Sequence, residues 1–154
     1  MTEAEVVSMG KLGGAAMLGL SAIGSALGAG VAAQAAVGAW KRCYAQSKLA
    51  PFMLVAFIGA PLSQTIYGFI IEGQIVSAAA AGAPWQGLVG AGMFGGLAMG
   101  ASAWLQGKAG ACASDALAET GQGTANYFMA LGIIETVALF TLAFLKKTIV
   151  IVTP

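Results

Sequence analysis

One acidic residue stands in the middle of a long apolar stretch of this sequence. Glu135 lies within residues 131–139, and its immediate neighbours are Ile134 and Thr136. If this stretch crosses a membrane, a carboxylate there costs about 2.5–3.5 kcal/mol on insertion scales, so it is normally paired, protonated or bound to a cation. Glu135 is therefore the centre of a candidate ion-binding site.

A second apolar stretch carries polar residues that could complete that site. Ala60, Ser63, Gln64 and Tyr67 recur at helical spacing, so they share one face of a helix. Pro61, in the same stretch, lacks an N–H and clashes with the preceding turn. We expect the helix to loosen there and to offer a backbone oxygen to a ligand, as broken helices do at ion sites.

Gln106, near the end of a third apolar stretch, adds another amide oxygen. The whole set supplies one carboxylate, two amide oxygens, two hydroxyls and a main-chain carbonyl, with no nitrogen or sulfur ligand. Such a set suits a hard cation, and one negative charge balances a monovalent one. Because protons alone would need only the carboxylate, the extra oxygens favour Na⁺ over H⁺, which stays open as the alternative.

Composition places these residues in a membrane protein. The chain has 154 residues, of which 58% are hydrophobic and 8% charged, and its mean hydropathy is +0.85. A soluble domain carries about 25% charged residues, so lipid is the expected solvent. A net charge of +1 without a basic run argues against nucleic acid. The chain has no GxxxxGK[ST] loop, and we expect neither a nucleotide site nor an organic cofactor in it.

Four stretches are long enough to span a bilayer, which takes about 20 apolar residues. We expect an all-α membrane protein whose helices cover about residues 12–40, 51–81, 85–118 and 125–147. They form two fused hairpins, over residues 1–82 and 83–154. A weak repeat, in which residues 19–26 resemble residues 96–103, predicts a duplication. In a second alignment Leu62 falls opposite Glu135, so only one hairpin carries the carboxylate.

Small residues recur at every fourth position of the first and third stretches. Gly24 and Gly28 stand on the first, and Gly92, Gly96 and Gly100 on the third. This spacing lets helix backbones approach closely in a membrane. We interpret it as a homo-oligomeric ring with these two helices inside and the bulkier second and fourth helices toward lipid. The alternative is pairwise packing within one bundle, which explains the excess of glycine less well.

Basic residues favour one orientation in the membrane. Lys41, Arg42 and Lys48 follow the first stretch, and Lys108 adds a charge on the same side. By the positive-inside rule, we expect a multi-pass protein of the cell membrane with cytoplasmic hairpin loops and both termini outside.

With these residues in view, the sequence resembles the proteolipid of the V-type ATPase membrane rotor, the four-helix c or K subunit. The resemblance covers nearly the whole chain and is nearest to the bacterial Na⁺-translocating members. It rests on the glycine-rich hairpins together with residues 61–68, 105–108 and 132–136. Ser63 is a departure, because threonine is familiar at that position.

The resemblance implies a non-catalytic, ion-translocating subunit of a rotary ATPase. Identical subunits would form a ring, against a stator subunit with an essential arginine, and a central-stalk subunit would dock on the cytoplasmic loops. Glu135 would carry Na⁺ as the ring rotates, coupled to ATP hydrolysis or synthesis elsewhere. Ser63, Gln64, Gln106 and the Ala60 carbonyl would be ligands, while Tyr67 would hydrogen-bond Glu135 and hold it ready.

Two other classes fit the sequence less well. A small four-helix multidrug exporter also depends on one membrane carboxylate, but places it in its first helix beside aromatic residues. Here the first stretch has no acid between residues 12 and 40. A purely structural proteolipid would leave Ser63, Gln64, Gln106 and Glu135 unexplained.

Overall fold

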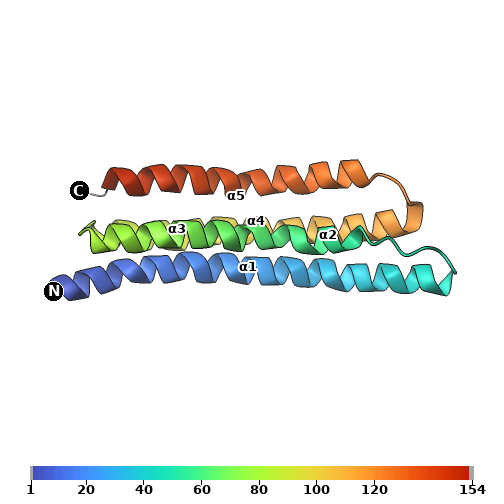
Figure 1. Cartoon of the computed structure of the whole chain (residues 1–154), viewed down its shortest axis with the longest axis horizontal. Coiled ribbons are helices and arrows are strands. Elements are labelled where there is room, and N and C mark those ends of the chain that lie inside the picture. The colour runs from blue at the N-terminus through green and yellow to red at the C-terminus, as the bar shows by residue number, and fades with distance from the viewer. Residues whose placement is uncertain (1, 153–154) are drawn as a thin grey trace.

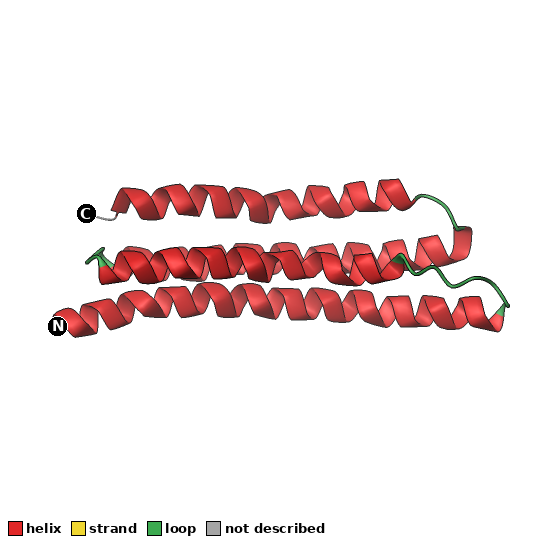
Figure 2. Cartoon of the chain, in the orientation of Figure 1, coloured by secondary structure: helices red, strands yellow, loops and turns green. Residues whose placement is uncertain are grey.

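The computed structural model describes residues 2–152, and this part of the chain is helical, with no strand (Figure 2). The elements are α1 (Glu3–Ala45), α2 (Leu54–Gly59), a 3₁₀ turn (Ala60–Leu62), α3 (Ser63–Ala80), α4 (Trp85–Thr120) and α5 (Thr124–Val152). Because α2, the 3₁₀ turn and α3 follow one another directly, they form one span. Residues 2–152 therefore contain four helices long and apolar enough to cross a membrane. The all-α fold with four spans is confirmed, and the chain is a multi-pass membrane protein.

The helices lie lengthwise beside one another (Figure 1). Both termini and the turn between α3 and α4 are at one end, and the other two connections are at the opposite end. Thus α1 and α4 run parallel, and α3 and α5 run against them. The short connections use glycine where φ is positive, at Gly82 (+85°) and Gly121 (+67°), a conformation that costs glycine little because it has no Cβ.

Helix α1 is longer at both ends than residues 12–40. It begins at Glu3 because Thr2 and Glu5 form a capping box: the Glu5 N–H donates to Thr2 Oγ1, and the Thr2 N–H donates to Glu5 Oε2. It continues to Ala45 because the charged residues after 40 do not break a helix, and Arg42 forms an ion pair with Asp115 of α4. The expected bounds of this helix were therefore wrong.

The second and fourth spans also differ from their expected bounds. The second starts at Leu54 instead of residue 51, because residues 46–53 form the connection that reverses the chain. The Pro51 carbonyl accepts a hydrogen bond of 2.8 Å from Trp40 Nε1, which fixes that turn against α1. Helix α5 runs past residue 147 to Val152.

Glycines bring α1 and α4 into backbone contact. A Cβ added to Gly92 would overlap the Gly13 carbonyl, one on Gly24 would overlap the Gly100 backbone, and one on Gly107 would overlap Gly28. The close approach expected of these two glycine-rich helices is therefore found within a single chain. The contact pairs occur at nearly the offset of the sequence repeat, so the repeated segments lie side by side.

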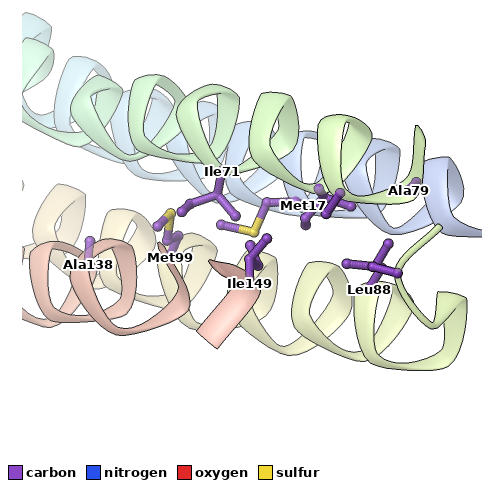
Figure 3. Close-up of a cluster of buried hydrophobic side chains, with 10 residues drawn as sticks. Met17, Ile71, Ala79, Leu88, Met99, Ala138 and Ile149 are labelled. Carbon is purple, nitrogen blue, oxygen red and sulfur yellow. The ribbon is translucent and has the colours of Figure 1, made fainter. Parts of the chain in front are cut away.

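A buried apolar cluster joins all four spans toward the end where the termini lie (Figure 3). Met17 of α1, Ile71 of α3, Met99 of α4 and Ala138 of α5 are each 0% exposed. Helix α5 is nevertheless the least covered span. In its most apolar 18-residue segment 11% of the residues are buried, against 33–44% in the corresponding segments of the other three spans. Most of its surface therefore faces lipid or another molecule.

Candidate ion-binding site

Glu135 lies half-buried on the side of α5 that meets α3 and α4. Its Oε1 accepts a hydrogen bond of 2.7 Å from the Tyr67 hydroxyl of α3. Its Oε2 accepts one of 3.3 Å from Gln106 Nε2 of α4. Both carboxyl oxygens thus have a donor from another helix, which fixes the orientation of the side chain.

Two buried glutamines connect the carboxyl group to α3. Gln64 and Gln106 are each 0% exposed, and Gln64 Nε2 donates to Gln106 Oε1 at 2.9 Å. Gln106 Nε2 also donates to the Leu131 carbonyl of α5 at 3.0 Å. Because an unpaired amide is costly in an apolar interior, these bonds hold both amides in one arrangement.

Three oxygens gather beside the glutamines, where Pro61 interrupts the second span. The 3₁₀ turn at Ala60–Leu62 is the loosening expected from Pro61, since proline cannot donate the regular helical bond. Here Ser63 Oγ lies 3.1 Å from the Ala60 carbonyl oxygen and 3.2 Å from Gln64 Oε1. The Ser63 hydroxyl can donate to either oxygen, and with its O–H rotated away all three oxygens could face a cation.

The structure therefore links every residue of the expected ligand set. Polar contacts within hydrogen-bond distance connect Ala60, Ser63, Gln64 and Gln106 to Glu135, and Tyr67 donates to the other oxygen of the carboxyl group. Among the described residues no group of three or more His, Cys, Asp or Glu could hold a metal. The arrangement thus combines a single carboxylate with neutral oxygens, a combination that balances one positive charge.

Two groups at this site were not predicted from the sequence. Ser102 Oγ of α4 donates to the Ile134 carbonyl at 2.9 Å, and the Leu131 carbonyl accepts from Gln106. Ser102 precedes Gln106 by four residues, so the two share a face of α4. That spacing was the available signal; a carbonyl acceptor leaves no trace in the side-chain pattern.

The second hairpin of the chain matches a known family. The family model that describes the C subunit of ATP synthase matches residues 89–145. The matched segment contains Ser102, Gln106 and Glu135, so the half of the chain that carries the carboxylate is similar to that ATP synthase component. Among curated proteins, none matches the chain.

Removing the Tyr67 hydroxyl tests its contact with the carboxylate. We expect Tyr67→Phe to lower the affinity of Glu135 for its ion about tenfold, because hydrogen bonds to charged groups are the stronger ones. The ring remains in Phe, so packing is retained. Tyr127→Phe is the control. Tyr127 lies on α5 and is half-buried, as Tyr67 is, but its ring packs edge-on against Phe57. The affinity is measured by Na⁺ protection of Glu135 from a carbodiimide. Equal affinities for both variants would contradict a role for the Tyr67 hydroxyl in ion binding by Glu135.

Proposed function

We propose that this chain is the ion-carrying rotor-ring subunit of a V-type ATPase, and that Glu135 binds Na⁺ and carries it across the membrane. The observation that carries the proposal is the placement of Glu135 within hydrogen-bond distance of both Tyr67 and Gln106, in the middle of a membrane span. The similarity of residues 89–145 to the C subunit of ATP synthase supports the same role.

Electrostatics explain how one carboxylate can couple ion binding to rotation. A bare carboxylate is strongly disfavoured in lipid, whereas one neutralised by a bound cation is tolerated. Each copy of Glu135 would therefore enter lipid only when loaded. It would release its ion beside the essential arginine of a stator subunit, where the positive charge replaces the cation.

The proposed ring and stalk use the remaining surfaces of the chain. The largely uncovered α5 would face lipid and the neighbouring copies. The last turn of α1 and the loop after it expose Lys41, Tyr44 and Lys48. This region would receive the central-stalk subunit on the cytoplasmic side, with both termini outside. ATP hydrolysis or synthesis would take place in the soluble sector.

Sodium is preferred to the proton because of the oxygens around Ser63. A proton on Glu135 would need only one acceptor or donor nearby. The Ala60 carbonyl, Ser63 Oγ and Gln64 Oε1 lie close enough to surround a small cation, and hard cations bind such oxygens. In a ring that carries H⁺, these three oxygens would have no cation to bind.

Direct binding measurements on the purified protein test this proposal. We expect a detergent-solubilised oligomer whose mass is a whole multiple of 15.3 kDa, and which binds one Na⁺ per chain in equilibrium dialysis. Gln64→Ala should lower Na⁺ affinity at least tenfold, because a buried ligand oxygen is lost and Gln106 Oε1 loses its donor.

Gln74→Ala provides the matched control, because Gln74 is the next glutamine along α3 and lies outside the hydrogen-bond network of Glu135. Its Na⁺ affinity should equal that of the unmodified chain. Ring oligomers that bind no Na⁺ but release protons on titration of Glu135 would favour the H⁺ alternative. A monomer that binds neither ion would overturn the rotor proposal.

A further inference from the structure

Ser102 makes a hydrogen bond that crosses from one membrane helix to the backbone of another. Ser102 is 4% exposed. Its hydroxyl donates to the Ile134 carbonyl of α5 at 2.9 Å. Ile134 directly precedes Glu135. The bond therefore holds the main chain of α5 at the residue next to the candidate ion-binding carboxylate.

Two other buried serines, one on α1 and one on α4, use their hydroxyls differently. Ser21 donates to the Met17 carbonyl and Ser114 to the Gly110 carbonyl, each within its own helix. This is the usual way a hydroxyl is satisfied in an apolar helix. Ser102 could likewise bond to a carbonyl of its own helix. Its bond to α5 instead requires that α4 and α5 pack in this register.

Ser102 and Gln106 together bracket Glu135. Gln106 Nε2 donates to the Leu131 carbonyl, one turn before Glu135, while Ser102 donates to the Ile134 carbonyl. Two side chains one turn apart on α4 thus hold two carbonyls about one turn apart on α5. Such a pair fixes both the rotation and the height of α5 relative to α4.

Apolar packing alone would not fix α5 in this way. Leucine and phenylalanine side chains contact lipid tails about as well as each other, so helix register in a membrane depends on close packing and polar contacts. Helix α5 carries a single glycine within its described span, Gly132, and a Cβ added there would meet nothing within 4 Å in the chain. The backbone-to-backbone glycine contacts that fix α1 against α4 are therefore not repeated at α5, where Gly95 of α4 meets only the end of the flexible Leu145 side chain.

We propose that Ser102 is a positioning residue for Glu135: it sets the register of α5 against α4 so that both carboxyl oxygens reach their partners on α3 and α4. This proposal rests on the proposed function of Glu135 as an ion carrier. Ser102 itself contacts neither carboxyl oxygen, and it acts through the backbone at Ile134. Without its bond α5 can shift, and the contacts of Glu135 with Tyr67 and Gln106 become less populated.

The test compares Ser102→Ala with Ser114→Ala in purified rings. Measured by Na⁺ protection of Glu135 from a carbodiimide, Ser102→Ala should raise the half-protecting Na⁺ concentration about 3- to 15-fold, the range for a hydrogen bond between membrane helices. Ser114→Ala should leave it unchanged, because that hydroxyl bonds to its own helix. Ser102→Thr, which retains a hydroxyl, should restore most of the affinity.

A double-mutant cycle separates positioning from a general loss of stability. If Ser102 acts by presenting Glu135 to Tyr67, the effect of Tyr67→Phe should shrink in the Ser102→Ala background. Additive effects, or an unchanged affinity in Ser102→Ala, would overturn the proposal. If the unmodified ring shows no Na⁺ protection, the sodium assignment fails instead. The same cycle is then measured through the pH midpoint of carbodiimide labelling. Positioning by Ser102 predicts that Ser102→Ala shifts this midpoint, and additive shifts in the double mutant would again contradict the proposal.

Discussion

Glu135→Gln should abolish Na⁺ binding by the purified ring and stop ATP-driven ion uptake by the assembled complex. Glutamine has nearly the shape of the acid, and its amide oxygen can still accept from the Tyr67 hydroxyl. Gln106 Nε2 loses its bond to the carboxylate but keeps the one to the Leu131 carbonyl, so the fold should persist. The negative charge is lost, however, and a cation buried without a counter-charge costs several kcal/mol. We therefore expect Na⁺ affinity to fall at least 100-fold, measured by equilibrium dialysis.

Glu72→Gln is the matched control for this loss of charge. Glu72 also lies half-buried in a membrane helix, but its side chain is directed to α1, where its Cγ would touch a Cβ added to Gly14. Na⁺ binding should be retained in this variant. Loss of binding in Glu72→Gln with retention in Glu135→Gln would place the ion elsewhere in the molecule.

Gly92→Ala should strongly destabilise the fold, although it adds a single methyl group. The new Cβ would overlap the carbonyl of Gly13, and neither backbone can move without separating α1 from α4. Forcing a group into a close-packed contact costs about 1–3 kcal/mol and more where backbone must shift, and helix pairs in membranes depend on such contacts. We expect the unfolding temperature of the detergent-solubilised protein to fall by at least 10 °C, or the yield of oligomer to vanish.

Gly90→Ala serves as the comparison, because a Cβ there meets nothing within 4 Å in the chain. Both variants change the same helix by the same methyl group, so helix propensity cancels between them. A similar unfolding temperature for the two would show that α1 and α4 do not touch at Gly92.

The spans were predictable because lipid allows few solutions for the backbone. A chain in hydrocarbon must satisfy its own N–H and C=O groups, so long apolar stretches become helices. The helix ends follow local chemistry that hydropathy does not register. Thr2 and Glu5 form a capping box, and α1 therefore begins at Glu3, nine residues before the apolar stretch that starts at about residue 12. This capping-box pattern could have predicted the start of the helix from the sequence.

The candidate site was predictable to the extent that its side chains are polar in an apolar sequence. Gln64, Gln106 and Glu135 stand out individually, and the structure places them in one network. Ser102 does not stand out, because one serine in a membrane helix usually bonds to its own backbone. Its bond to Ile134 depends on how α4 meets α5, and that register is a property of the packed helices.

Carbodiimide labelling of Glu135 across a Na⁺ titration at fixed pH is the most direct test of the sodium site. Carbodiimides react with the protonated acid, so a bound metal ion should protect it. We expect labelling of the purified ring to fall as Na⁺ rises, with no protection by K⁺ at the same concentrations. Labelling that follows pH and ignores Na⁺ would contradict the sodium assignment, and Glu135 that is never labelled would contradict its role as the ion carrier.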